Sequence, residues 1–269
     1  MPTLDKRKTS MQSQPREISD EVRERRERVF LVLAGFFLCA MTMLNIIGIT
    51  RFIQLGPMAL AVGVLPYPLT FLCTDLISEL YGRARANFMV SVGLGLNFFI
   101  LGTMWLGNAM PSVGPENQPP WQLIQLAEDV ALPNGSSVTG SVELFTLLYA
   151  TTTGAVMASM MAYIAAQYCD VYIFHFLKRL TKGKHLWLRN NGSTLISQGV
   201  DSFMVITVTF GAQFLAGVMS AGAMLVLMGS NYLFKLCVAL ADTLPFYMGV
   251  HYLSKYLELS EEELMAHAE

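Results

Sequence analysis

The chain has 269 residues, of which 53% are apolar and only 14% are charged. Soluble domains carry about 25% charged residues, so this composition argues against an ordinary soluble domain and predicts a membrane protein. The net charge of −2 excludes no class of partner. The cysteines show neither CxxC nor Cys/His spacing, so neither a disulfide framework nor a zinc site is predicted: Cys39, Cys73, Cys169 and Cys237.

The N-terminal 28 residues form a polar segment with eight Lys/Arg and six Asp/Glu residues. Mixed charge of this kind is typical of a solvated cytoplasmic tail, although residues 18–28 could also form a short helix on the membrane surface. Residues 29–49 are uncharged and long enough to cross a bilayer, which takes about 20 residues. We therefore predict a tail over 1–28 followed by the first span.

A second apolar run, residues 58–73, leads into the stretch PYPLTFLCTDLISELYGRARA, residues 66–86. Pro66 and Pro68 would remove two backbone donors from the middle of this span. Such a break persists at membrane depth only where it faces protein or a water-filled cavity. A packing kink and a cavity-lining break are both compatible with the sequence.

The third predicted span covers residues 87–107, and a long loop, 108–142, follows it without any Lys or Arg. Within that loop the apolar spacing over 121–132 predicts a helix lying on the bilayer surface. Residues 144–167 make the fourth span, in which Gly154, Ala158 and Ala162 form a small-residue stripe suited to close helix packing.

A basic loop over 176–192 separates the fourth span from the fifth, residues 193–215, and the sixth, residues 219–253. Sixteen of the eighteen Lys/Arg residues then lie on one side of the membrane. Because positive charge is retained in the cytoplasm, we predict an all-α polytopic membrane protein. It has six transmembrane helices over 29–257, cytoplasmic termini, an extracytoplasmic loop over 108–142 and an acidic tail over 258–269.

Five charged residues fall within or near three of these spans: Asp75, Glu79, Asp201, Lys235 and Asp242. Each is costly at membrane depth unless it has a partner or a function, so we expect the three helices to turn them toward one another. Plainer roles stay open. Glu79 is spaced for a helical pair with Arg83, and Lys235 could neutralise either Asp201 or Asp242.

Aromatic and amide side chains accompany these charges. Gln198 precedes Asp201 by three residues, so both point the same way on a helix. Apolar walls with a few fixed polar groups are typical of a small-molecule site, and aromatic faces suit a planar heterocycle. The candidate substrate-binding residues are Asp201, Gln198, Tyr67, Phe71, Asp75, Glu79, Phe203, Lys235 and Asp242.

Catalytic motifs are missing from the sequence. It contains no GxSxG nucleophile elbow, no HExxH zinc helix and no Walker A sequence. We therefore expect no enzymatic activity, no metal and no cofactor, and we expect that this chain does not itself hydrolyse ATP.

Two stretches carry a resemblance to a known family: residues 66–86, quoted above, and LWLRNNGSTLISQGVDSFMV, residues 186–205. Together they are similar to the bacterial queuosine precursor transporters, a six-span inner-membrane group related to vitamin uptake carriers. The resemblance adds family positions without assigned roles: Asp75, Glu79, Tyr81, Arg83, Arg189, Asn190 and Ser197.

The resemblance implies import of 7-cyano-7-deazaguanine or its aminomethyl form across the bacterial inner membrane. It implies a small-molecule substrate and a lipid bilayer as partners, with no nucleic acid; a homo-oligomer stays open. A deazaguanine presents a 2-amino group and N1–H side by side, and a carboxylate such as Asp201 can accept from both. Proton coupling, facilitated diffusion, a substrate-capture subunit of an energy-coupling-factor importer and a non-transporting membrane protein remain alternatives.

Overall fold

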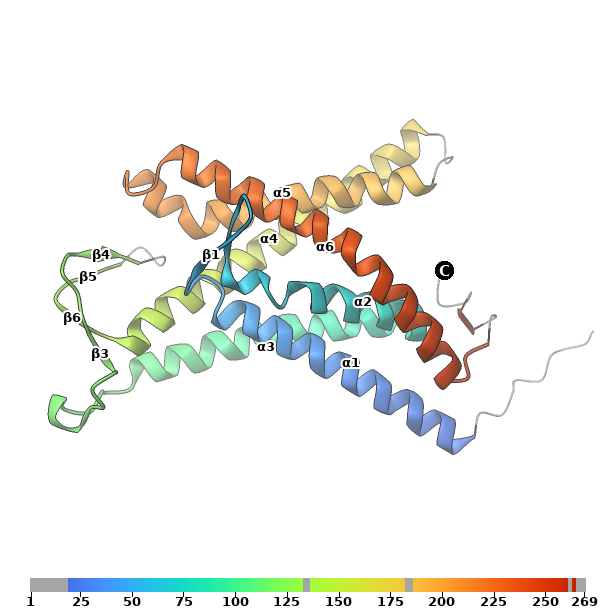
Figure 1. Ribbon diagram of the computed structural model, residues 1–269, viewed down its shortest axis with the longest axis horizontal. Helices are drawn as coiled ribbons and strands as arrows, with labels where there is room; N and C mark the ends of the chain where they lie inside the picture. The colour runs from blue at the N-terminus through green and yellow to red at the C-terminus, as the bar shows by residue number, and fades with distance from the viewer. Residues whose placement is uncertain (1–18, 133–135, 182–185, 261–262, 265–269) are drawn as a thin grey trace, which may run out of the picture.

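The computed structural model describes residues 19–132, 136–181, 186–260 and 263–264. Helices dominate this part of the chain (Figure 1). They are α1 (Asp20–Ile46), α2 (Tyr67–Tyr81), α3 (Arg83–Ala109), α4 (Leu144–Leu180), α5 (Leu186–Leu215) and α6 (Ala221–Tyr256). Short elements complete the description: β1 (Phe52–Leu55), β2 (Met58–Ala61), η1 (Val62–Val64), η2 (Pro115–Asn117), β3 (Leu123–Gln125), β4 (Val130–Ala131), β5 (Ser137–Val138) and β6 (Ser141–Glu143).

Five helices in the described residues are long and apolar enough to cross a membrane. They confirm the predicted class of a mostly helical membrane protein. The remaining helix, α2, has 15 residues, or roughly 22 Å at 1.5 Å per residue, which is short of a hydrocarbon core of about 30 Å. A sixth crossing and the cytoplasmic position of both termini therefore stay predictions.

The first helix begins earlier than the hydropathy indicates. Ser19 caps α1, its hydroxyl accepting a hydrogen bond from the Val22 amide at 3.4 Å, and Asp20 and Glu21 lie in the first turn, where acidic residues favour the helix dipole. Residues 20–28, expected in the polar tail, are therefore the first turns of α1. Residues 1–18 of that predicted tail lie outside the described residues.

The prediction that the second span runs from residue 58 with a kink or break at Pro66 and Pro68 is wrong. A hairpin, β1–β2, occupies the first part of this region, with Leu55 opposite Met58 across the two-residue loop Gly56–Pro57. Gly56 has a φ of 58°, as the first position of a type II′ turn requires, and proline suits the second. Pro66 and Pro68 then lie at the start of α2, where missing donors cost nothing. The prolines begin a helix and do not break one.

The predicted interfacial helix over 121–132 is also wrong. Antiparallel pairs β3–β6 and β4–β5 form there, at the end of the molecule opposite the start of α1 and the end of α6 (Figure 1). Apolar runs this short cannot separate strand from helix by periodicity. Pairing with residues 137–143 satisfies the backbone, for example through the Leu126 amide, which donates to the Gly140 carbonyl at 2.7 Å.

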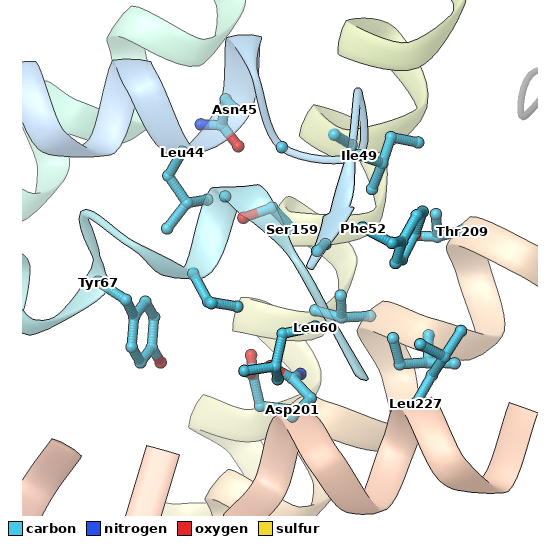
Figure 2. A pocket seen from close by; sticks show the side chains of 18 of the residues that line it. Leu44, Asn45, Ile49, Phe52, Leu60, Tyr67, Ser159, Asp201, Thr209 and Leu227 are labelled. Atoms are coloured by element: carbon cyan, nitrogen blue, oxygen red, sulfur yellow. The ribbon is translucent and has the colours of Figure 1, made fainter. Parts of the chain in front are cut away.

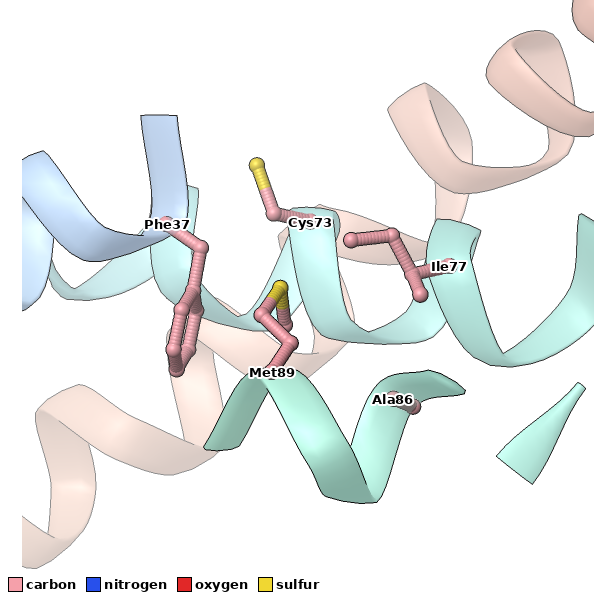
Figure 3. Close-up of a cluster of buried hydrophobic side chains, with 5 residues drawn as sticks. All are labelled: Phe37, Cys73, Ile77, Ala86 and Met89. Atoms are coloured by element: carbon pink, nitrogen blue, oxygen red, sulfur yellow. The ribbon is translucent and has the colours of Figure 1, made fainter. Parts of the chain in front are cut away.

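Helices α1, α2 and α3 share an apolar core (Figure 3). It is built from Phe37, Cys73, Ile77, Ala86 and Met89. Cys73 is free and 2% exposed, as is common for a cysteine without a disulfide.

Helices α4 and α5 pack along each other, and α6 contacts α5, α2 and β2 (Figure 1). Ala158 and Ala162 of the small-residue stripe are 1% and 0% exposed, as close packing predicts. Because α6 contacts both α2 and α5, it places its polar residues between them.

Candidate functional site

The site is built around an ion pair between α5 and α6. The ammonium nitrogen of Lys235 donates to Oδ2 of Asp201, and the two side chains are 7% and 18% exposed. Two opposite charges buried together at membrane depth avoid the penalty that either would incur alone. Of the two partners that the sequence left open for Lys235, Asp201 is therefore the correct one.

Tyr67 joins this pair from α2. The Lys235 nitrogen lies 5.2 Å from the centre of the Tyr67 ring, within the range of a cation–π contact. Phe71, one turn along α2, packs edge-on against Tyr67 with ring centres 4.6 Å apart. Because α2 begins at Tyr67, the hairpin and prolines before it decide where this ring meets the ammonium group.

Asp201, Lys235 and Tyr67 line a cavity of about 240 Å³ (Figure 2). Leu44 and Asn45 of α1 border it on one side and Asp201 and Leu60 on another. Apolar side chains provide most of the rest of the wall, and four aromatic residues face the space: Phe52, Tyr67, Tyr163 and Phe210. The rings of Phe52 and Phe210 contact each other at 5.8 Å. The cavity thus combines one charged pair with flat apolar walls.

The β1–β2 hairpin closes the cavity between α1 and α6. The Ala59 amide donates to the Ser230 hydroxyl of α6 at 3.1 Å, which anchors β2. At the base of the hairpin, a Cβ on Gly63 would lie 2.7 Å from the Cα of Gly48. Only glycine allows the two backbones to cross this closely, so the fit of the hairpin depends on this pair.

Two buried amides add hydrogen-bonding capacity to the cavity wall. Nδ2 of Asn45 donates to Oδ1 of Asn97 on α3 at 2.9 Å, while the Asn45 carbonyl oxygen is buried without a hydrogen-bond partner in the described residues. Asn231, one turn before Lys235, is 9% exposed and also lines the cavity. Each amide could read a polar edge of a ligand.

The other predicted site residues lie at several places around this centre. Gln198 lies three residues before Asp201, with its side-chain carbonyl oxygen buried and unpaired in the described residues. Phe203 is 54% exposed and is not among the lining residues. Asp75, Glu79 and Asp242 lie on α2 and α6 beyond the cavity wall.

Of the positions taken from the family resemblance, the side chains of Arg83, Arg189 and Asn190 fall outside those that the structure describes. The postulated Glu79–Arg83 pair is therefore untested. Tyr81 lies at the end of α2, where its hydroxyl donates to the Arg26 carbonyl at 2.8 Å, a contact that joins two helices far from the cavity.

Sequence reasoning missed part of the lining. Asn231 was detectable, since it precedes Lys235 by four residues and so shares its helix face. Ser159 and Tyr163 have the same spacing on α4. The hairpin residues had no usable signal, because strands of four residues are too short for a reliable period.

Among the described residues, no group of three or more His, Cys, Asp or Glu side chains is placed to hold a metal ion.

Comparisons with known proteins identify the family of the chain. The family model described as "Putative vitamin uptake transporter" matches residues 61–249, which include α2, the ion pair and most of α6. The chain is 28% identical over 203 residues to the "Probable queuosine precursor transporter" of Bacillus subtilis (strain 168), covering 74% of each chain. No solved structure matches the chain. With most of its length matched, including both members of the ion pair, the chain belongs to the putative vitamin uptake transporter family.

Proposed function

We propose that the chain imports queuosine precursors, 7-cyano-7-deazaguanine or 7-aminomethyl-7-deazaguanine, across the bacterial inner membrane by alternating access. The observation that carries the proposal is the Asp201–Lys235 pair in an aromatic-lined cavity. The similarity to a probable queuosine precursor transporter supports the substrate class. The matched family and the matched relative are both described as transporters, which agrees with a non-enzymatic role.

Asp201 is the reader of the base in this proposal. Its Oδ2 accepts from Lys235, and within the described residues Oδ1 has no hydrogen-bond partner. The 2-amino group and N1–H of the base would donate to this carboxylate, with the ring against an aromatic wall. A buried polar site of this kind discriminates strongly against analogues that leave its groups unpaired. Gln198 or Asn231 would meet the carbonyl edge.

The distribution of Lys and Arg supports an orientation of the chain in the membrane. The start of α1 and the end of α6 lie at one end of the molecule and the β3–β6 strands at the other (Figure 1). Arg25 and Arg85 lie at the first end, whereas residues 108–142 contain no Lys or Arg. By the positive-inside rule both termini are cytoplasmic, and the stranded end is extracytoplasmic.

Uptake of radiolabelled base into proteoliposomes containing only this chain tests the function. We expect the wild type and Asp129→Asn, a matched change in the exposed loop, to take up base and Asp201→Asn to lose uptake. Each variant is first checked for insertion and for a monodisperse profile in detergent. Wild-type uptake by Asp201→Asn would remove this residue from the site.

The same assay separates the alternatives. A chain that binds the base in detergent and transports it only with added ATPase and coupling subunits would be a substrate-capture subunit. A chain that neither binds nor transports the base would be a different kind of membrane protein. In cells lacking precursor synthesis, queuosine in tRNA gives an independent measure of import.

A further inference from the structure

Two carboxyl groups lie on the contacting helices α2 and α6 and do not line the substrate cavity. Asp75 lies on α2 and Asp242 on α6, and their charges interact electrostatically. An apolar cluster lies on each side of them along the two helices. The one toward the cavity contains Phe71, Phe234 and Val238. The one toward the helix ends contains Leu76, Phe246 and Val250.

Asp242 is buried, and no described side chain neutralises it. It is 8% exposed, and in the part of the chain that the structure describes it has neither a hydrogen bond nor an ion pair. An ionised carboxylate in such a place costs several kcal/mol, whereas a protonated carboxyl group costs much less. This feature distinguishes Asp242 from Asp201, which has Lys235.

Among the described side chains, the neighbours of Asp242 supply no positive charge. From α2, Asp75 and Cys73 interact with it electrostatically, and Glu79 is the next titratable group along that helix. From α5, Asp201 is occupied by Lys235. Lys235 itself lies two turns away on α6, roughly 10 Å along the helix axis. A second negative charge beside Asp242 makes its ionised form still less favourable.

We propose that Asp242 and Asp75 form a proton-binding pair that couples import to the proton gradient, an inference that rests on the proposed transport function. Asp75 is exposed whereas Asp242 is buried, so only one of the two carboxyl groups is enclosed by the protein. The substrate and the proton then bind at separate places, at Lys235–Asp201 and at Asp242–Asp75.

The coupled step moves one proton with each base. One proton from extracytoplasmic water binds the pair, which then carries one negative charge fewer, and the same proton is released to cytoplasmic water after the base has left. Pro245 lies one turn beyond Asp242 inside α6. It removes the hydrogen bond to the carbonyl four residues earlier, so α6 can bend beside the group whose charge changes.

Infrared spectroscopy of the purified, base-free protein in D₂O tests the proton directly. We expect the wild type and Asp129→Asn at neutral pH to show the carbonyl-stretch band of a protonated carboxyl group, and Asp242→Asn to lack it. Persistence of the full band in both Asp242→Asn and Asp75→Asn would overturn the proposal. This result does not depend on whether the chain transports deazaguanines.

Proteoliposome uptake tests the coupling. With the outside one pH unit more acidic, one coupled proton supports up to about tenfold accumulation of base. We expect the wild type to accumulate base under this gradient and Asp242→Asn only to equilibrate it. Identical plateaus for the wild type with and without the gradient would overturn the coupling. Absence of uptake under any condition would instead count against the proposed function, leaving the infrared result to decide on the proton.

Discussion

Two ion pairs, one in the middle of α6 and one just beyond its C-terminal end, place the same kind of contact in two different environments. Lys235 and Asp201 meet at membrane depth with side chains 7% and 18% exposed. Arg26 of α1 and Glu263, beyond α6, meet at the helix ends with exposures of 16% and 35%. Lys235 and Asp201 are buried, so each has few other groups to bind. Arg26 and Glu263 are more exposed, so water can hydrogen-bond to either of them in place of the other. A buried pair is weak evidence for stability, which favours recognition as the role of the first.

The Arg26–Glu263 pair belongs to a set of contacts between the first turns of α1 and the residues that end and follow α6, which we call the terminal clasp. Arg26 also donates to the carbonyl oxygens of Leu257 at 3.0 Å and Glu258 at 3.1 Å, and Arg25 donates to the Tyr256 carbonyl at 2.8 Å. Tyr256 and Leu257 are the last residue and the C-cap of α6, where a helix leaves carbonyl groups without an intrahelical donor. The clasp therefore caps one helix with side chains from another.

The largest effect should come from breaking the buried pair on one side. Lys235→Ala leaves Asp201 as an unpaired buried charge and should destabilise the protein by about 3–5 kcal/mol. The double variant Lys235→Ala/Asp201→Ala removes both charges and should recover much of that loss. SDS titration of the protein in detergent measures both. Additive losses from the two single changes would show that the residues do not act as a pair.

The clasp should give a smaller loss. Arg26→Ala removes hydrogen bonds to two backbone carbonyls and to Glu263 and should cost about 1–3 kcal/mol. It should also expose the segment after α6 to carboxypeptidase. Arg28→Ala is the matched control, because Arg28 is 74% exposed and pairs with Glu24 at i,i+4, a contact worth about 0.3–0.5 kcal/mol. Equal digestion of the two variants would argue against the clasp.

The clasp could not have been predicted from the sequence. The acidic residues after 257 are typical of a solvated tail, yet Leu257 is 0% exposed, and Leu259 and Leu264 pack against the Leu76–Leu80 cluster. Arg26 and Glu263 are 237 residues apart. Nothing local in either segment identifies the other as its partner.

The helices, in contrast, followed from hydropathy, because crossing a membrane demands long apolar runs that a window detects. Asp201, Lys235 and Tyr67 were named for the same reason, since a charge or phenol in such a run is conspicuous. The sequence could not decide whether Asp201 or Asp242 is the partner of Lys235. It depends on how α5 and α6 pack, and on a hairpin whose four-residue strands carry no clear period.

Acid should open the clasp and leave the buried pair in place. Hydrogen bonds from Arg26 are the main cause that lowers the pKa of Glu263 from 4.5 to about 2, and the Ser260 amide adds to them, against the opposing effect of burial. Because this pKa is lowered in the folded state, its stabilisation is complete above pH 4.5 and is lost as the pH falls toward 2.

Anisotropy of a fluorophore attached to the C-terminus should therefore fall over that pH range, as the segment after α6 gains freedom. Glu263→Gln, which cannot titrate, should show low anisotropy throughout and no transition in this range. A wild-type signal that does not change between pH 5 and pH 2.5 would contradict the assignment of the clasp to Glu263.

The smallest effect is expected for an uncharged buried pair, Asn45 and Asn97. Its coupling energy is a reference for the two charged pairs. Asn45 donates to Asn97 between α1 and α3 at 2.9 Å, and the two residues are 1% and 2% exposed. Polar contacts between membrane helices contribute about 0.6 kcal/mol on average. A double-mutant cycle of Asn45→Ala and Asn97→Ala in SDS titration should therefore give a coupling energy near that value. The same cycle for Lys235 and Asp201 should give a coupling energy several-fold larger, because charge, and not burial alone, makes that pair costly to break.

Equal coupling energies would mean that Lys235 and Asp201 interact as a neutral pair. The ionised carboxylate that we propose to bind the base would then not exist in the empty protein.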